Sequence, residues 1–136
     1  MKLAVACEHR GYEAKRRLLP VLKKWGHQVT DFGCDAPGAV DYPDLAIPAS
    51  RAVINGTAEA AILLDGSGIG MSIAANKVFG VRAALAHDEV TARIEHAERL
   101  IGGRVVQAWK QQCGGSSAVV DENVRLAPDA DVKTDE

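Results

Sequence analysis

The sequence has no surplus of one charge, no long apolar run and too few cysteines for a disulfide framework. Sixteen lysines and arginines stand against eighteen aspartates and glutamates, for a net charge of −2. This balance gives no broad attraction to nucleic acid or to an acidic membrane surface. No apolar run approaches the ~20 residues that a membrane helix needs, and residues 1–7 lack the pattern of a signal peptide. We therefore expect no nucleic-acid partner and no membrane association.

The three cysteines are Cys7, Cys34 and Cys113, an odd number at wide spacing. They form neither a disulfide framework nor a metal-binding pair. A reducing cytoplasm is the simplest expected location, and Cys7 is expected to be a small core residue. With 136 residues, the chain is long enough for one domain with a real core but too short for two.

Strand-like and helical segments alternate along the first 100 residues. The predicted strands cover residues 2–7, 27–32, 60–64 and 81–86. The predicted helices cover residues 11–25 and 44–54, a short stretch from a glycine-rich loop to 76, and 88–99. We expect Pro20 to kink or break the first helix, and Gly26 to close it. This order predicts right-handed βαβ units and an α/β fold in which helices cover both faces of a parallel sheet.

The periodicity weakens after residue 100. Residues 100–106 are compatible with one more strand, whereas residues 113–136 carry six acidic and two basic side chains among Gly, Ser, Ala and Pro. We therefore predict a domain over residues 1–112, followed by a poorly ordered acidic tail over 113–136.

The most informative motif is the glycine-rich segment Asp65-Gly66-Ser67-Gly68-Ile69-Gly70. Its G-x-G-x-G spacing is not the dinucleotide fingerprint, and it lacks the Lys and Ser/Thr of a P-loop. Three glycines can turn backbone N–H groups toward one point, and a helix N-terminus follows, so the segment predicts a site for a phosphate or a developing oxyanion. A tight strand-to-helix turn without a ligand is the structural alternative. Because ligands of parallel sheets bind at the carboxyl ends of the strands where strand order reverses, we expect residues 7–11 and 65–70 to share one site.

Five side chains near these two segments are candidates for chemistry. Asp65 can act as a general base, or it can cap the following helix. His9, beside Glu8 at the end of the first strand, is a candidate proton carrier, and a structural histidine is the alternative. Asn76 and Lys77 either bind a ligand or end the short helix.

Four segments resemble the ribose-5-phosphate isomerase B family, which also includes the galactose-6-phosphate isomerase subunits. They are CEHRGYEAK (7–15), DYPD (41–44), GSGIGMSIAANK (66–77) and GVRAA (80–84). The match runs in order over about residues 1–94, and the third segment is the most specific to the family.

The resemblance implies a Rossmann-like three-layer fold, a homodimer or dimer of dimers, and no metal or organic cofactor. The implied reaction is aldose–ketose isomerisation of a sugar phosphate, most directly ribose 5-phosphate to ribulose 5-phosphate, through a cis-enediolate. In this reading Asp65, His9 and His96 are catalytic. The implied substrate-binding residues are Glu8, His9, Tyr42, Gly66, Ser67, Gly68, Ile69, Gly70, Asn76 and Lys77.

The sequence departs from the family pattern around the expected base and acid. Glu8 stands where the family usually has aspartate. Asp65 replaces the cysteine base of many members, and Met71 replaces the glutamate of others, so Asp65 is the base that remains. A carboxylate is ionised at neutral pH in water, whereas an unperturbed thiol mostly is not. If the helix is shorter than in the family, His96 stands in for the family's general-acid histidine, and Ala97 replaces the asparagine that follows it. An ungapped alignment instead places Glu98 and Arg99 at these two positions.

The last third of the chain departs further. Gln107-Ala108-Trp109 resembles the end of the family's final helix with several turns missing before it, so we expect a shortened C-terminal helix. Residues 114–120 contain neither of the arginines with which the family binds phosphate. Two alternatives therefore stay open: a structural or regulatory relative that binds a sugar phosphate without turnover, and an isomerase for a smaller or non-phosphorylated sugar.

Overall fold

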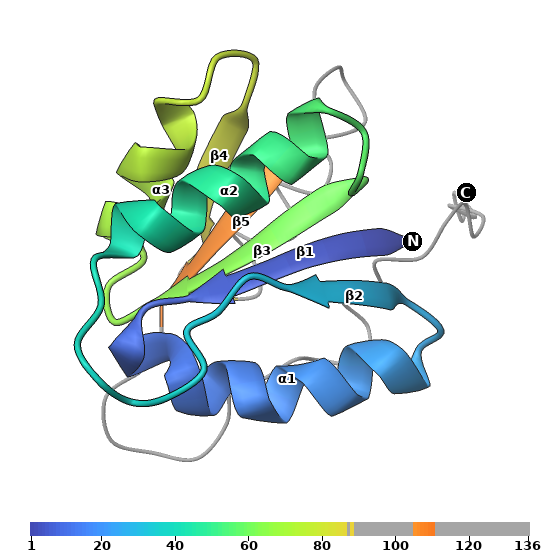
Figure 1. Ribbon diagram of the computed structural model, residues 1–136, viewed down its shortest axis with the longest axis vertical. Helices are drawn as coiled ribbons and strands as arrows, with labels where there is room; N and C mark the ends of the chain where they lie inside the picture. Colours follow the sequence, from blue (N-terminus) through green and yellow to red (C-terminus); the bar gives the residue numbers. More distant parts are fainter. Residues whose placement is uncertain (87, 89–104, 111–136) are drawn as a thin grey trace, which may run out of the picture.

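The computed structural model describes residues 1–86, residue 88 and the backbone of residues 105–110. Within these residues, parallel strands form one sheet in the order β2-β1-β3-β5-β4 (Figure 1). The strands are β1 (Lys2–Cys7), β2 (Gln28–Asp31), β3 (Ala60–Asp65), β4 (Arg82–Ala86) and β5 (Val105–Lys110). Among the described strands, β2 pairs with β1 alone and so forms one edge of the sheet.

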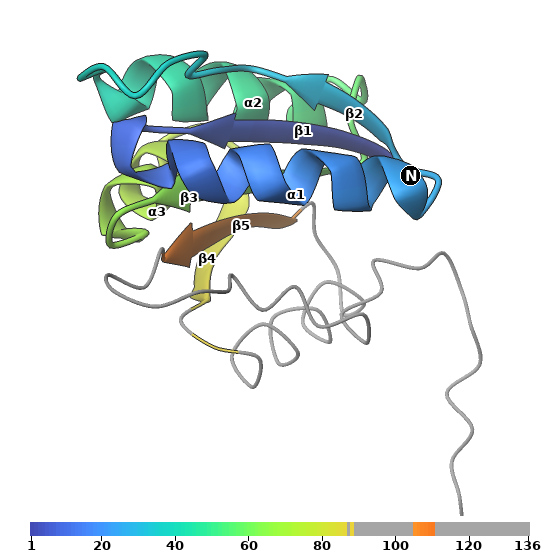
Figure 2. The same cartoon turned by 90° about the horizontal axis from the view of Figure 1, so that it is seen from below.

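Helices cover both faces of this sheet, which confirms the predicted three-layer α/β architecture. They are the 3-10 helix η1 (His9–Gly11) and the helices α1 (Tyr12–Lys24), α2 (Tyr42–Ile54) and α3 (Ile69–Asn76). In Figure 2, α1 lies in front of the sheet and α2 behind it. The helix α3 packs beside α2, so these two share one face.

The alternation of side chains along the central strands explains the two layers of core. Along β1, Leu3, Val5 and Cys7 pack toward α1, whereas Ala4 and Ala6 pack toward α2 and α3. All six residues of β3 are buried, as a strand covered on both faces requires. Cys7 has no exposed surface, which confirms its prediction as a core residue.

The first long helix continues through its proline. We expected Pro20 to kink or break the helix, and the break is wrong, because α1 is continuous from Tyr12 to Lys24. The predicted end at Gly26 is confirmed, because this residue has φ +83° and its N–H donates to the carbonyl of Lys23. A second bond from His27 N–H to the carbonyl of Leu22 completes a Schellman motif.

The position of β5 corrects one expectation. The resemblance predicts that residues 107–109 end a shortened helix, and this is wrong, because they lie in β5 between β3 and β4. The β-branched Val105 and Val106 favour a strand, and parallel pairing on both sides supplies the backbone hydrogen bonds. Of the predicted strand 100–106, the last two residues fall in β5. The predicted helix 88–99, apart from residue 88, and the tail 113–136 lie outside the described residues.

The strand order reverses at β1. The chain passes from β1 through α1 to β2 on one side, and then through α2 to β3 on the other side of β1. The carboxyl ends of β1 and β3 therefore flank the position where parallel α/β sheets bind ligands. In the part of the chain that the structure describes, no helix combines the length and apolarity needed to cross a membrane.

Candidate active site

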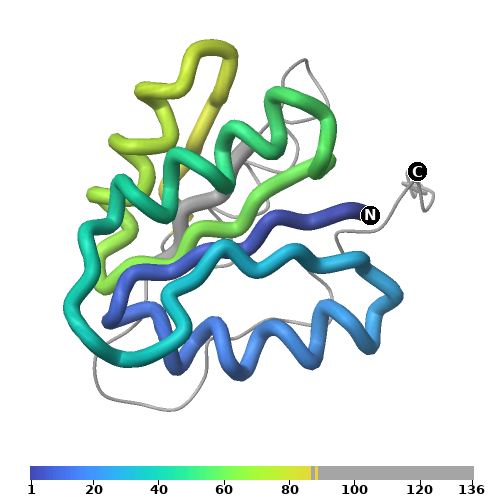
Figure 3. The backbone as a smooth tube through the Cα atoms, in the orientation of Figure 1, coloured from blue at the N-terminus to red at the C-terminus, as the bar shows by residue number. Residues whose placement is uncertain are grey.

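The two predicted segments meet at the carboxyl edge of the sheet. Residues 8–11 follow β1, and the glycine-rich loop 66–68 follows β3 and leads into α3. Figure 3 shows the two turns side by side, and a hydrogen bond from Gly66 N to Glu8 Oε1 of 2.9 Å joins them. This confirms that the segments share one place in the fold. The end of η1 also packs closely on β3. Position 11 needs a glycine there, since a Cβ on Gly11 would lie 2.5 Å from the carbonyl oxygen of Leu64.

Glu8 connects the two segments through a single carboxylate oxygen. It is the N-cap of η1 with extended backbone, and Oε1 accepts from Arg10 N and from Gly66 N, each at 2.9 Å. The residue is 5% exposed, so these charge-assisted bonds are largely shielded from water. We predicted Glu8 as a substrate-binding residue, and the structure uses its Oε1 to position the loop.

His9 is anchored by the other oxygen of the same carboxylate. Its Nδ1 lies 2.7 Å from Glu8 Oε2, which makes an ion pair when the ring is protonated. The His9 side chain is 36% exposed, so the anchored ring still reaches solvent at this edge of the sheet. A histidine in this position can carry a proton to or from a bound ligand.

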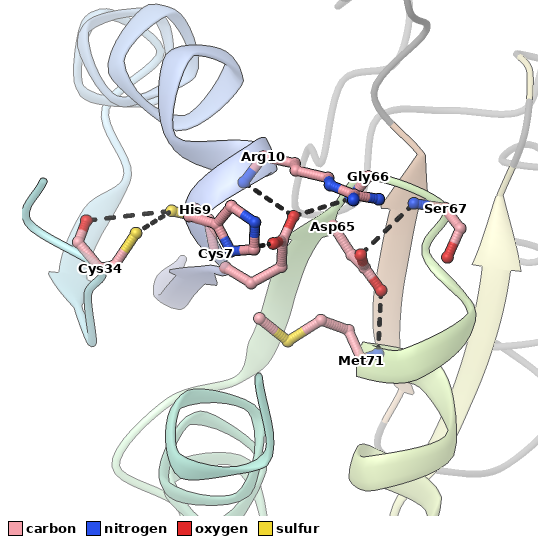
Figure 4. A network of polar contacts seen from close by, with 9 residues as sticks. Cys7, His9, Arg10, Cys34, Asp65, Gly66, Ser67 and Met71 are labelled. Carbon is pink, nitrogen blue, oxygen red and sulfur yellow. Dashed lines mark hydrogen bonds and ion pairs between the residues drawn. The ribbon is translucent and has the colours of Figure 1, made fainter. Parts of the chain in front are cut away.

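Asp65 is held at the end of β3 by backbone N–H groups of the loop and of α3. Its Oδ1 accepts from Ser67 N and its Oδ2 from Met71 N, both at 3.3 Å (Figure 4). The contact to Met71 caps the first turn of α3, as the structural alternative requires. A carboxylate oxygen has a second lone pair, so this capping leaves Asp65 able to take a proton.

The loop offers fewer free donors than its glycine content predicts. Gly66 N donates to Glu8, and Ile69 N donates to Ser67 Oγ at 3.2 Å. Among the described residues, the N–H groups of Gly68 and Gly70 donate no hydrogen bond. Gly68 is the N-cap of α3 with φ +79°, a left-handed conformation that favours glycine. These two N–H groups, at the positive end of α3, are where an anion or oxyanion can bind.

Tyr42 lies against the same loop. It is the first residue of α2 and is 39% exposed. A Cβ on Gly70 would lie 3.2 Å from the Tyr42 ring and 3.3 Å from Asp65 Oδ2. The missing side chain at Gly70 therefore lets the tyrosine ring approach the carboxylate. The structure thus brings Tyr42 to the predicted site from a segment that is distant in sequence.

Asn76 and Lys77 are not part of this group. They lie at the end of α3 opposite its first turn, and Lys77 is its C-cap. The Asn76 amide donates to the carbonyls of Ser72 and Ala83 at 2.9 and 2.8 Å, and its oxygen accepts from Ala83 N at 3.0 Å. These bonds attach α3 to β4, the structural role that the sequence left open. His96 lies outside the described residues.

Behind the site, two cysteines face each other. Cys7 Sγ is 3.7 Å from Cys34 Sγ, and both residues are buried free thiols. Burial, with the neighbouring Cys34 thiol adding to it, raises the pKa of Cys7 to about 12. The thiol is therefore protonated at neutral pH and is not a base for the site. Within the described residues, no group of three metal-ligating side chains gathers at one point.

Sequence reasoning missed one cation at the site. The side chain of Arg10 lies over Gly66, where a Cβ would be 2.6 Å from Arg10 Cδ. Because Arg10 directly follows His9 in the sequence, its proximity to the site was predictable, but its contact was not. Its packing on Gly66, 56 positions away, depends on the pairing of β1 with β3 and has no local sequence signal.

Residues 3–107 match the model of the ribose/galactose isomerase family. The chain is similar to ribose-5-P isomerase B of Listeria innocua, with 42% identity over 119 residues that cover 88% of this chain and 79% of that protein. It is also similar to the structure of ribose-5-phosphate isomerase B from Clostridium thermocellum, with TM-score 0.78, 36% identity, and coverage of 85% and 76%. The enzyme from Mycoplasma genitalium, solved with bound ribulose-5-phosphate, gives TM-score 0.72 and 32% identity, with coverage of 80% and 71%.

Proposed function

Because this chain belongs to the ribose/galactose isomerase family, we propose that it interconverts ribose 5-phosphate and ribulose 5-phosphate. The relatives named ribose-5-phosphate isomerase B support this substrate pair, and one of them was solved with the ketose product bound. The observation that carries the proposal is the position of Asp65. Its carboxylate lies at the switch point of the sheet, beside the N–H groups of Gly68 and Gly70, which have no hydrogen-bond acceptor among residues 1–86.

The geometry supports proton transfer through an enediolate. Asp65 takes the proton from C2 of the open-chain aldose. The C2–H electron pair forms the C1–C2 double bond of the enediolate as the C1 carbonyl pair moves onto O1. O1 then gains a proton, the C2 hydroxyl loses its own to become the carbonyl, and Asp65 returns its proton to C1 to give the ketose. Negative charge develops on the oxygens at C1 and C2 during this step. We propose that the N–H groups of Gly68 and Gly70 donate to one of these oxygens, and one such donor typically contributes about 10²–10³ in rate.

His9 and His96 complete the proposed chemistry. His9, held by Glu8, assists opening of the sugar ring by moving a proton at the ring oxygen or at the C1 hydroxyl. We propose His96 as a general acid for the sugar oxygens. A His96→Gln variant should then lower kcat while leaving KM for ribose 5-phosphate within about threefold of the original value.

The chain is proposed to act as a homodimer or a dimer of dimers. Ile69 and Ile73, one turn apart on α3, are 54% and 53% exposed, and Phe79 just after α3 is 98% exposed. A dimer would cover such a patch. Light scattering after size exclusion should give a dimer or tetramer mass, and Ile73→Glu should shift it toward the monomer. A cytoplasmic location is also proposed, since the buried free thiols suit a reducing compartment.

The function is tested by following ketose formation from ribose 5-phosphate. The chain should convert this sugar, and Asp65→Asn should lower kcat by at least about 100-fold. Glu59→Gln is the matched control, because Glu59 lies at the amino edge of the sheet, where it contacts Lys2 N. Absence of turnover with every four- to six-carbon aldose phosphate would contradict the proposal. Thermal stabilisation by the sugar phosphate without turnover would instead identify a binding protein.

A further inference from the structure

We infer that Arg10 binds the phosphate group of the sugar phosphate, an inference that rests on the proposed function. The residue is the middle position of η1 and is exposed at the carboxyl edge of the sheet. Its aliphatic stem lies over Gly66, since a Cβ there would be 2.6 Å from Arg10 Cδ and 3.2 Å from Arg10 Cβ (Figure 4). The stem thus lies against the residue that directly follows Asp65.

The guanidinium of Arg10 has no anionic partner among the described residues. Two nearby cations on α1 are occupied, because Arg16 pairs with Glu13 and the buried Lys15 pairs with Asp31. The carboxylate beside Arg10 is also occupied, because Glu8 accepts from two backbone N–H groups and faces His9. Arg10 therefore presents its side-chain donors beside the site, and no side chain in the described part of the chain accepts from them.

Charge balance at the site favours a phosphate as the partner. Two carboxylates, Glu8 and Asp65, lie at this edge, and both repel a sugar phosphate that approaches it. A cation next to them offsets that repulsion, and a guanidinium can donate two parallel hydrogen bonds to phosphate oxygens. The free N–H groups of Gly68 and Gly70 remain for the reacting oxygens. The site then has separate donors for the two ends of the substrate.

The glycine at position 66 is part of this arrangement. Gly66 has no side chain to displace the Arg10 stem, and its N–H is fixed by Glu8. A methyl group at this position would push Arg10 Cδ away while leaving the guanidinium itself intact. Gly66→Ala should therefore weaken phosphate binding less than removal of the guanidinium does.

The experiment compares Arg10→Ala, Arg10→Lys and Gly66→Ala with the unmodified chain. Arg10→Ala should raise KM for ribose 5-phosphate by about 10- to 100-fold, as expected for loss of one or two charge-assisted bonds, with kcat changed less than about threefold. The KM of Arg10→Lys should lie between those of the unmodified chain and Arg10→Ala. The ratio of kcat/KM for ribose 5-phosphate to that for ribose should decrease in Arg10→Ala, which a general loss of structure would not produce. Arg17→Ala is the matched control, because Arg17 is an exposed arginine of α1.

Thermal-shift titration with inorganic phosphate provides a readout that is independent of turnover. Phosphate should raise the melting temperature of the unmodified chain and of Arg17→Ala, and this rise should be lost in Arg10→Ala. If the chain does not isomerise but phosphate binding requires Arg10, the proposed function fails and the inference stands. If the chain isomerises and Arg10→Ala keeps its KM and phosphate response, the inference fails and the function stands.

Discussion

Removal of the Glu8 side chain should loosen the connection between β1 and the glycine-rich loop. In Glu8→Ala, the N–H groups of Arg10 and Gly66 both lose their acceptor, Oε1. Loss of an N-cap typically costs about 0.5–2 kcal/mol, and an unsatisfied N–H about 1–3 kcal/mol. Water can reach part of this site, so we expect a decrease of about 2–3 kcal/mol in the free energy of unfolding.

Glu8→Gln separates the hydrogen bonds from the charge. The amide oxygen of glutamine can take the position of Oε1 and accept from both N–H groups. This variant should therefore lose less than about 1 kcal/mol of unfolding free energy. Glu13→Ala is the control for loss of a nearby glutamate side chain. It should change the free energy of unfolding little, since the Glu13–Arg16 pair is exposed and such pairs contribute little.

The same variants should differ in activity. Displacement of the loop by about 1 Å can lower turnover about 100-fold, so Glu8→Ala should lose about that factor in kcat/KM. Glu8→Gln should stay within about tenfold of the unmodified chain. Urea unfolding followed by far-UV circular dichroism, together with the isomerase assay, measures both effects. An equal loss in Glu8→Ala and Glu8→Gln, or no loss in Glu8→Ala, would refute the role of Oε1.

Three further predictions concern pH, thiol chemistry and α3. Burial, and then the N-terminal ammonium, lower the pKa of His27 from 6.5, so at a given pH the unfolded chain binds more protons at this residue than the folded chain does. The free energy of unfolding should therefore decrease as the pH falls below about 6.5. His27→Gln should reduce this pH dependence in urea-unfolding curves, and an unchanged dependence would contradict the prediction. With its pKa raised to about 12, Cys7 should resist alkylation by iodoacetamide at pH 8 until urea unfolds the chain. Peptide mass spectrometry measures the labelling, and rapid labelling of Cys7 in the folded chain would contradict a buried, protonated thiol. Asn76→Ala should lower the free energy of unfolding by about 1–2 kcal/mol with KM unchanged, whereas a higher KM at constant stability would restore the predicted substrate contact.

Local patterns in the sequence predicted the elements that position the site. The apolar run before Glu8, the buried run before Asp65 and the short helix after the loop are all present in the structure. These signals are local, because strand burial and helix starts depend on neighbouring residues. The reversal of strand order was also predictable, since alternating strands and helices restrict the possible connections.

The remaining features depend on contacts between distant segments. The sequence predicted a strand as far as residue 106, but residues 107–110 could be assigned to β5 only from their pairing with β3 and β4. The motif predicted a loop of free N–H donors, but Glu8 occupies the N–H of Gly66 from another strand. The stem of Arg10 reaches Gly66 through the same strand pairing. Side-chain partners across a sheet are not encoded in the spacing of a single segment.

The most direct test of Asp65 as the base is isomerisation of ribose 5-phosphate in deuterium oxide, followed by proton NMR. A carboxylate that exchanges its proton with solvent should deliver deuterium to C1 of the ribulose 5-phosphate that forms. We predict this product for the unmodified chain and its loss by at least about 100-fold in Asp65→Asn. Deuterated ribulose 5-phosphate formed by Asp65→Asn at the unmodified rate would contradict the account.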